Sequence, residues 1–184
     1  SSALRFKQYP SACLITSRGC FGKCIYCDTA VFGQKQRHFS ADYVINMIKE
    51  MLFKYGVKDI SFYDDIFVSP PSRIKSICES IHKEKLNFTW TCDARIDVIR
   101  SIDDLKMFKE AGCYQISYGI ESGSQEILDF LKKNIKLEKV RQVIEWTSQV
   151  GIHPKGFFIL GHPKETEETM KMTLRLAKEL PLKS

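Results

Sequence analysis

Short apolar runs alternate with longer amphipathic segments along this chain, and that alternation limits its fold more than any other feature. Each apolar run has the length of a strand, and each amphipathic segment repeats its apolar residues at helical spacing. Strands are predicted at 12–16, 57–65, 88–97, 114–122 and 153–163, and helices at 41–56, 72–85, 103–112, 124–150 with a break near Asn134, and 165–180. Crossovers of this length suit parallel pairing, so five strand-helix units predict an α/β fold with a parallel sheet.

The length of the chain narrows the choice among parallel α/β folds. With 184 residues, it is too short for a complete eightfold barrel. Five units would fit a flavodoxin-like open sheet, and a curved partial barrel lies between the two. No linker or low-complexity segment interrupts the pattern, so we expect a single domain over residues 1–184. A further strand would be due at "ELPLKS", where the chain stops, so we expect a fragment of a longer protein.

Composition and charge exclude several functional classes. No apolar run approaches the roughly 20 residues of a membrane span, and the first residues lack the pattern of a signal peptide. We therefore expect a cytoplasmic protein without membrane contact. The net charge of +6 is mild and the lysines are scattered, which argues against direct nucleic-acid binding. Reduced thiols are expected in this setting, and Cys78, Cys92 and Cys113 lie singly in apolar stretches typical of a core.

Three further cysteines crowd into "TSRGCFGKCIYCDTAVFG", as Cys20-x-x-x-Cys24-x-x-Cys27. Zinc normally needs a fourth ligand, and the nearest imidazole, His38, lies eleven residues beyond Cys27. A redox pair of Cys24 and Cys27 would leave Cys20 unexplained. Three close thiolates suit an iron-sulfur cluster better, because soft sulfur ligands favour such clusters. Four irons held by three cysteines leave one iron open to another ligand.

Polar or glycine-containing segments follow the carboxyl ends of all five predicted strands. They are "GCFGKC", "YDD", "DARID", "GIESGS" and "GHP". Parallel α/β sheets bind their ligands at this edge. We therefore expect one shared rim that contains the three-cysteine loop.

The cysteine spacing, with Tyr26 directly before the last cysteine, resembles the radical S-adenosylmethionine (radical SAM) superfamily. The likeness extends along the chain. "YDD" at 63–65 stands where that family has a Gly-Gly-Glu type motif, and "YGIESGSQEILDFLKK" from Tyr118 resembles its fourth-strand segment. "GFFILGHPKETEET" resembles its G-x-I-x-G segment, with Ile159 and Gly161. The sequence departs from the pattern at "YDD" and at Phe21, where many relatives have proline.

This resemblance implies a partial parallel (β/α)6-type TIM-like barrel, with about five strand-helix units in this chain. It implies a 4Fe-4S cluster and S-adenosylmethionine as cofactors. An electron from the cluster would cleave S-adenosylmethionine into methionine and a 5'-deoxyadenosyl radical, which abstracts hydrogen from a substrate that the sequence does not identify. The segments "FYDDIF" and "CDARID" look most like the class with a cobalamin-binding domain ahead of the radical domain. An electron donor such as flavodoxin or ferredoxin is implied as a partner.

The resemblance also implies a role for each candidate site residue. Cys20, Cys24 and Cys27 would hold the cluster. The residues expected to contact S-adenosylmethionine are Asp64 or Asp65 at its ammonium group, Arg95 at its carboxylate, Glu121 and Ser122 at the ribose and sulfonium, Lys133 at the ribose or carboxylate, and Tyr26, Phe158 and Ile159 at the adenine.

Several of these residues also have simple structural interpretations. Asp64 and Asp65 could form a turn or a helix cap, and Arg95 could pair with a neighbouring aspartate. Lys133 lies near a helix end, where cations are favoured.

The two His-Pro dipeptides and the two tryptophans are interpreted structurally. His153 and His162 are expected in turns, and Trp90 and Trp146 are expected to pack.

The leading expectation is the radical domain of a larger enzyme, for which methyltransferase, cyclase and other oxidoreductase activities all fit. A second possibility is a methylthiotransferase-like enzyme that modifies tRNA or a ribosomal protein, which a downstream nucleic-acid-binding domain would support. A third is a module that binds an iron-sulfur cluster or S-adenosylmethionine without turnover. It would differ from the others in lacking cleavage of the ligand.

Overall fold

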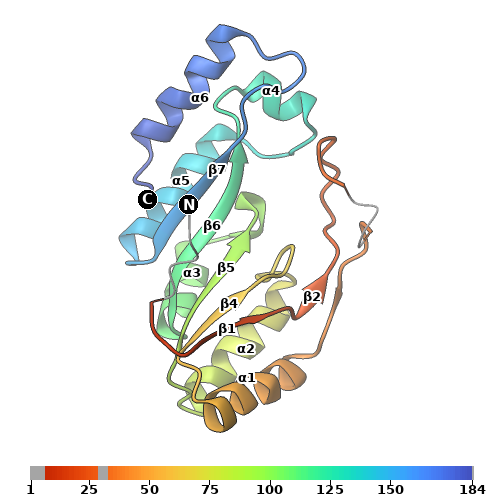
Figure 1. The fold of residues 1–184 in the computed structure, drawn as a ribbon. Helices are drawn as coiled ribbons and strands as arrows, with labels where there is room; N and C mark the ends of the chain where they lie inside the picture. The colour runs from red at the N-terminus through yellow and green to blue at the C-terminus, as the bar shows by residue number, and fades with distance from the viewer. Residues whose placement is uncertain (1–6, 29–32, 184) are drawn as a thin grey trace.

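The structure is a computed structural model that describes residues 7–28 and 33–183. Across these residues the main sheet has five strands in the order β1-β4-β5-β6-β7 (Figure 1). The strands are β1 (Ser11–Leu14), β4 (Asp59–Phe62), β5 (Thr89–Ala94), β6 (Cys113–Glu121) and β7 (His153–Phe158). Each strand pairs with its neighbour in parallel. The predicted α/β fold with a parallel sheet is therefore confirmed.

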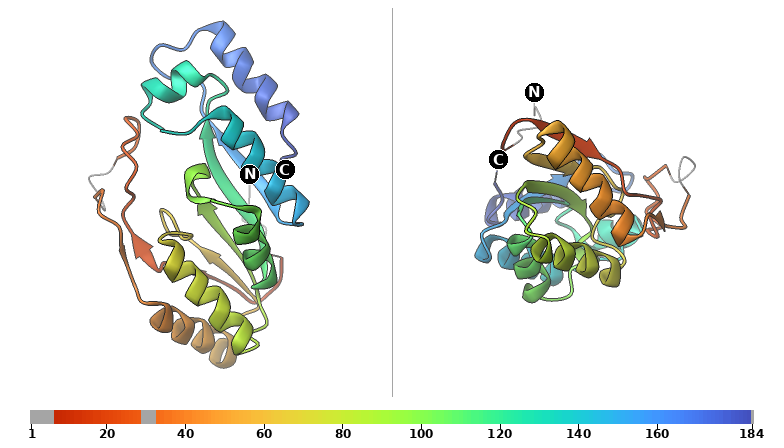
Figure 2. Two further views of the ribbon diagram at one scale, coloured as in Figure 1. Left: turned by 180° about the vertical axis from the view of Figure 1, so that it is seen from behind. Right: turned by 90° about the horizontal axis from the view of Figure 1, so that it is seen from below.

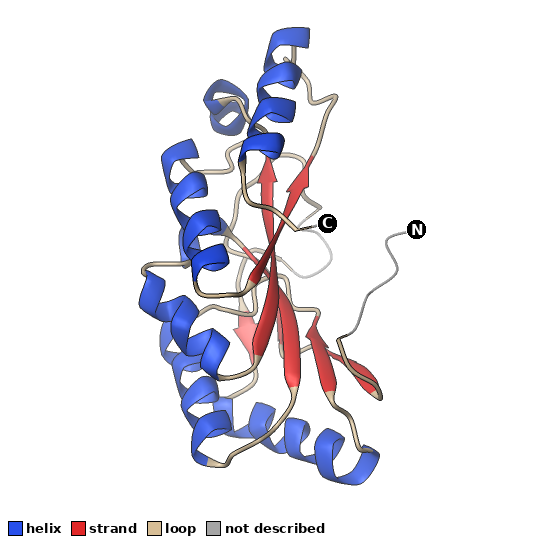
Figure 3. Cartoon of the chain, turned by 90° about the vertical axis from the view of Figure 1, so that its left-hand side faces the viewer, coloured by secondary structure: helices blue, strands red, loops and turns tan. Residues whose placement is uncertain are grey.

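The helices lie on one side of this sheet (Figures 2 and 3). They are α1 (Ala41–Tyr55), α2 (Pro71–Lys83), α3 (Ile102–Glu110), α4 (Gln125–Phe130), α5 (Leu137–Gln149) and α6 (Glu167–Glu179). Within the described part of the chain, no helix is long and apolar enough to cross a lipid bilayer.

Local sequence signals set the ends of these helices. The hydroxyl of Ser40 accepts a hydrogen bond from the backbone N–H of Tyr43 at the start of α1, and Gly56 ends that helix with a φ of 66°. The predicted break near Asn134 separates α4 from α5, and Asn134 itself has a φ of 55°. Asparagine adopts this left-handed conformation more readily than most residues, so it suits a break between helices.

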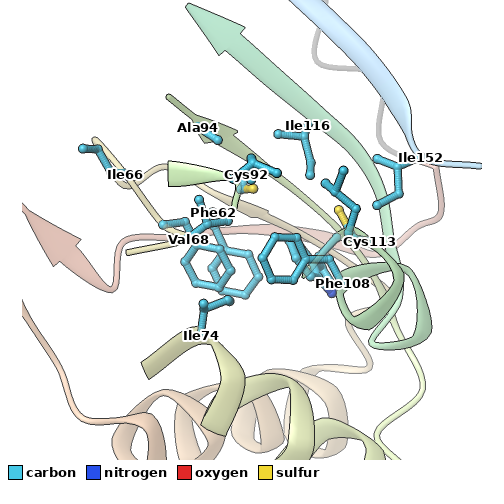
Figure 4. Close-up of a cluster of buried hydrophobic side chains, with 14 of the residues drawn as sticks. Phe62, Ile66, Val68, Ile74, Cys92, Ala94, Phe108, Cys113, Ile116 and Ile152 are labelled. Carbon is cyan, nitrogen blue, oxygen red and sulfur yellow. The ribbon is translucent and has the colours of Figure 1, made fainter. Parts of the chain in front are cut away.

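The core lies between the sheet and the helices that cover it (Figure 4). The rings of Phe62 and Phe67 stack with centroids 3.9 Å apart, and Trp90 packs against both in edge contacts. Cys78, Cys92 and Cys113 are each 3% exposed or less, which confirms their prediction as core residues. Trp146 packs against the same core from a partly buried position, so both tryptophans are packing residues as predicted.

No described helix covers the other face of the sheet (Figure 3). The strand register places polar side chains on this face. Side chains alternate between faces along a strand, so residues paired across parallel strands share a face. Two polar rows result: Ser61, Thr91, Gln115 and His153, and next to them Asp93, Ser117 and Lys155. This bare polar face adjoins the carboxyl rim of the sheet.

The sequence did not predict a short antiparallel pair beside the rim. Strand β2 (Ser17–Arg18) pairs with β3 (Arg37–His38), and the two bracket the three-cysteine loop. Strands of two residues have no hydrophobic period, so their pairing cannot be predicted from a pattern. The pair closes the base of the loop.

The burial of Phe62 leads to a prediction about stability. We expect Phe62→Ala to lower the free energy of unfolding by about 3 to 5 kcal/mol, because it empties a site in the aromatic core. The control is Tyr63→Ala, because Tyr63 is 42% exposed beyond the end of the same strand. It should cost about 0.5 kcal/mol or less. Urea unfolding measures both, and equal losses would contradict this placement of the core.

Candidate active site

The three-cysteine loop is held at its two ends and in its middle by backbone hydrogen bonds. The N–H of Cys20 donates to the carbonyl of Gly33 (3.3 Å), and the N–H of Ile25 donates to the carbonyl of Leu131 (3.1 Å). At Gly19, φ is 89° and a Cβ would lie 2.5 Å from the carbonyl oxygen of Lys35. Glycine is therefore required where the loop leaves β2.

The thiols of the loop are free, and their exposure differs. Cys24 is buried, Cys20 is intermediate and Cys27 is exposed. Desolvation raises the pKa of Cys27, and the charges of Cys20 and Cys24 raise it further, so the three thiols lie close enough to repel one another when ionised. In the part of the chain that the structure describes, no three His, Cys, Asp or Glu side chains already converge as a metal site. The loop thus brings the three thiols near one another, but they do not surround a common metal position.

Arg95, which follows β5, supplies a positive charge against this loop. Its Nη1 donates to the Sγ of Cys24 (3.6 Å), and its other nitrogens bind the carboxylate of Asp97 and the carbonyl of Lys133. A Cβ on Gly22 would lie 2.7 Å from that Nη1, so glycine leaves room for the guanidinium. The predicted ion pair between Arg95 and a neighbouring aspartate is therefore present, and the guanidinium also touches the thiol.

A buried ion pair lies at the end of β6. The Nζ of Lys133 is 2.9 Å from the Oε1 of Glu121 and 3.2 Å from the hydroxyl of Tyr26. The two charged side chains are 8% exposed or less. Glu121 adopts a φ of 72°, and a Cβ on Gly119 would lie 2.5 Å from its Oε1. The strand therefore needs a glycine there for the carboxylate to fold back over it.

Tyr26 connects this ion pair to the three-cysteine loop. Burial raises the pKa of Tyr26, and the charges of Glu121 and Cys24 raise it further. Its phenol therefore stays protonated and neutral across the ordinary pH range. Glu121, Lys133 and Tyr26, three residues predicted for the ligand site, lie together at one place on the rim.

The two aspartates after β4 have different surroundings. Asp64 is 2% exposed, and its carboxylate accepts hydrogen bonds from the backbone N–H and hydroxyl of Thr16. The guanidinium of Arg73 also donates to the Thr16 hydroxyl, which ties α2 to the end of β1. Asp65 is exposed, and its Oδ2 accepts from the N–H of Gly19 (2.7 Å) at the entry to the loop. Asp65 is thus the member of the pair beside the cysteines.

Ser122 and Phe158 make contacts with α6 and with the core in this structure. The hydroxyl of Ser122 is fully buried and lies 3.2 Å from that of Thr173 in α6. Phe158 packs against the hydrophobic core, whereas Phe157 is 50% exposed. Adjacent strand residues point to opposite faces of a sheet, so the alternation along β7 predicts that Phe157 and Phe158 lie on different faces.

Ile159 and His162 lie where the rim continues beyond β7. Ile159 is 38% exposed, and its N–H donates to the carbonyl of Glu121 (2.9 Å). His162 is only 8% exposed, and its ring packs against that of Tyr26 with centroids 5.6 Å apart. The sequence predicts a turn at His162, and nothing in the local pattern indicates its contact with Tyr26.

A family model agrees with this arrangement of cysteines, sheet and rim. Residues 14–177 match the model described as the radical SAM superfamily. The chain belongs to the radical SAM superfamily. Membership implies a 4Fe-4S cluster and S-adenosylmethionine as cofactors and an enzyme of the radical SAM class.

Two relatives and one solved structure show how far the similarity extends. An uncharacterized methyltransferase of Pyrococcus horikoshii is 34% identical over 94% of this chain. Cytidylyl-2-hydroxyethylphosphonate methyltransferase of Streptomyces wedmorensis is 30% identical over 82% of the chain. The structure of the cobalamin-dependent S-adenosylmethionine radical enzyme OxsB covers 93% of the chain with a TM-score of 0.82 at 23% identity. This likeness of fold confirms the partial TIM-like barrel.

The match covers a minor part of each of these proteins. The chain spans 38% of the first relative, 28% of the second and 27% of OxsB.

The buried pair of Glu121 and Lys133 leads to a prediction. We expect Glu121→Gln to lower the free energy of unfolding of the metal-free protein by about 3 kcal/mol, because it leaves the Lys133 charge buried without its partner. The double variant Glu121→Gln with Lys133→Met should recover most of that loss, since no charge then remains buried. Urea unfolding of both variants measures the difference. A double variant less stable than the single one would contradict this account.

Proposed function

We propose that this domain holds a 4Fe-4S cluster on Cys20, Cys24 and Cys27, and that the protein cleaves S-adenosylmethionine reductively to begin a radical reaction. The observation that carries the proposal is the three-cysteine loop itself, which lies at the carboxyl rim of a radical SAM domain. Its donors are three free thiols on one short segment, with a guanidinium against one of them.

The chemistry of these donors fits such a cluster. Thiolates are the usual ligands of iron-sulfur clusters. The closeness of the three thiols supports closure of the loop around a cluster, because bound iron would offset their mutual repulsion. When bound, the cluster supplies an open iron and the electron that divides S-adenosylmethionine into methionine and a 5'-deoxyadenosyl radical.

The chain's own residues would bind and orient the ligand around that open position. Asp65 is exposed beside the loop and suits the ligand's ammonium group, whereas Asp64 is occupied by Thr16. Arg95 would meet the methionine carboxylate from its place against Cys24, with Asp97 holding its orientation.

Residues at the ends of β6 and β7 would receive the nucleoside. Glu121 and Lys133 present a carboxylate and an ammonium group near Tyr26, and these groups suit ribose hydroxyls. Tyr26 and Ile159 offer partly exposed apolar surface for the adenine. Ser122 and Phe158, whose side chains face α6 and the core, would act by supporting these residues.

We propose methyl transfer as the reaction class of the longer protein to which residues 1–184 contribute the radical domain. Two relatives of 30% identity or more are named methyltransferases, and OxsB is named cobalamin-dependent. We extend cobalamin to this protein on that basis, bound by a segment outside this chain, with flavodoxin or ferredoxin as electron donor. Modification of tRNA or a ribosomal protein, and binding without turnover, are the alternatives that the experiment must separate.

The test is anaerobic reconstitution of the full-length protein with iron and sulfide. We expect about four irons per chain and a cluster chromophore. Each of the variants Cys20→Ser, Cys24→Ser and Cys27→Ser should lose most of that iron. Cys13→Ser is the matched control, because Cys13 is an exposed, free cysteine of β1 outside the loop. Iron content unchanged in all three loop variants would contradict the proposal.

Product analysis separates the alternatives. Reduction of the reconstituted protein with S-adenosylmethionine should release 5'-deoxyadenosine, and its absence with a bound ligand would favour the binding-only module. Isotope from the methyl group of S-adenosylmethionine should appear in the product of a methyltransferase. Its appearance as a methylthio group on tRNA or a ribosomal protein would favour the methylthiotransferase instead.

A further inference from the structure

His162 is a buried imidazole that the proposed function has not used. It follows β7 directly, in the turn "GHP", and 8% of its surface is exposed. Its Nε2 is buried and has no hydrogen-bond partner among the residues that the structure describes. A buried polar atom without a partner costs about 1 to 3 kcal/mol. Such an atom at a ligand site points to a partner that arrives with the ligand.

The turn that carries His162 is held firmly. The Oε2 of Glu165 accepts hydrogen bonds from the backbone N–H groups of Gly161 (2.6 Å) and His162 (2.9 Å). Gly161 has a φ of 91°, which L side chains rarely adopt, and this bends the chain sharply after β7. The imidazole is therefore fixed by its own turn, and its free nitrogen is not the result of a loose loop.

The surroundings of His162 indicate which ligand it faces. Its ring lies against Tyr26, whose hydroxyl contacts Lys133, which in turn pairs with Glu121. These are the groups assigned above to the ribose and the adenine. The groups assigned to the methionine end, Arg95 and Asp65, contact the cysteine loop at Cys24 and Gly19. His162 thus belongs to the nucleoside side of the rim.

We propose that Nε2 of His162 binds the nucleoside half of S-adenosylmethionine by a hydrogen bond to the edge of its adenine base. A neutral imidazole carries one N–H and one lone pair, and the adenine edge offers both acceptors and a donor. The flat base would pack near Tyr26, where the imidazole already makes a tilted ring contact. This proposal rests on the proposed function, because it assumes that S-adenosylmethionine binds at this rim.

The test measures ligand affinity in the full-length protein with its cluster reconstituted. The probes are S-adenosylmethionine, S-adenosylhomocysteine and methionine, each titrated anaerobically. His162→Phe retains a ring against Tyr26 but removes the nitrogen. We expect it to weaken both adenosyl ligands by about tenfold to a hundredfold. Methionine, which lacks the nucleoside, should bind as it does to the unchanged protein.

Two further variants separate hydrogen bonding from packing. His162→Gln loses the ring but retains a donor and an acceptor, so it should recover most of the affinity for S-adenosylmethionine. The matched control is His153→Phe, because His153 also precedes a proline but is exposed at the start of β7. It should leave all three affinities unchanged.

Several outcomes would overturn the proposal. If His162→Phe binds S-adenosylmethionine as tightly as the unchanged protein, the imidazole only packs against Tyr26. If all three ligands weaken equally, or if the iron content falls in both His162 variants, the residue supports the cysteine loop instead. If only His162→Phe loses its cluster, the affinity of His162→Gln for S-adenosylmethionine becomes the test. A loss of tenfold or more in that affinity would contradict the proposal.

The same samples keep this proposal distinct from the proposed function. A cluster and 5'-deoxyadenosine in the unchanged protein support the proposed function whatever the His162 variants do. If the unchanged protein does not bind S-adenosylmethionine, both the proposed function and the role proposed for His162 are wrong.

Discussion

The buried ion pair between Lys133 and Glu121 is the interaction on which the rim of this molecule depends. It joins the end of β6 to the connection between α4 and α5, and through the phenol of Tyr26 it reaches the three-cysteine loop. The attraction between two charges this deeply buried offsets the free energy of their desolvation only with good geometry and further hydrogen bonds. Gly119, which leaves space for the carboxylate, and the left-handed backbone of Glu121 provide that geometry. Replacing a buried ion pair by well-packed apolar residues is often neutral or stabilising, so stability alone does not explain why this pair is here.

A second buried group secures the opposite side of the loop. Asp64 accepts from Thr16 and lies near the guanidinium of Arg73, so the end of β1, the end of β4 and helix α2 are held together. Asp65, the next residue, accepts from the N–H of Gly19 and holds the entry to the loop. The three-cysteine loop is therefore anchored from both flanks of the sheet while its thiols stay free. This arrangement fixes where a cluster would form. Binding of the metal would then draw the sulfur atoms together.

The sequence predicts local features of this fold well and non-local ones poorly. Ser40, Gly56 and Asn134 act through their own backbone, so the ends of α1 and the break between α4 and α5 follow from them. The cysteine spacing needs no structure to be noticed. The burial of Ser122 does not follow from the local sequence, because its hydroxyl contacts Thr173 in α6, far along the chain. The burial of His162 depends on Tyr26, which lies far away in sequence.

The bare face of the sheet constrains what can cover it. The Ser117 hydroxyl and the charge of Lys155 both act to lower the pKa of Asp93, and the hydroxyls of Ser61 and Thr91 lie 3.0 Å apart. Desolvation raises the pKa of Asp93 although its side chain is exposed, so added burial would favour its neutral form further. An apolar surface laid over this face would strand the charge of Lys155 and several polar groups without partners, at a cost of a few kcal/mol for each charge. Whatever faces these strands, whether water, a polar ligand or another segment, must therefore supply hydrogen bonds. The core on the helix side shows the opposite character, so one face of the sheet carries the apolar packing and the other carries polar groups.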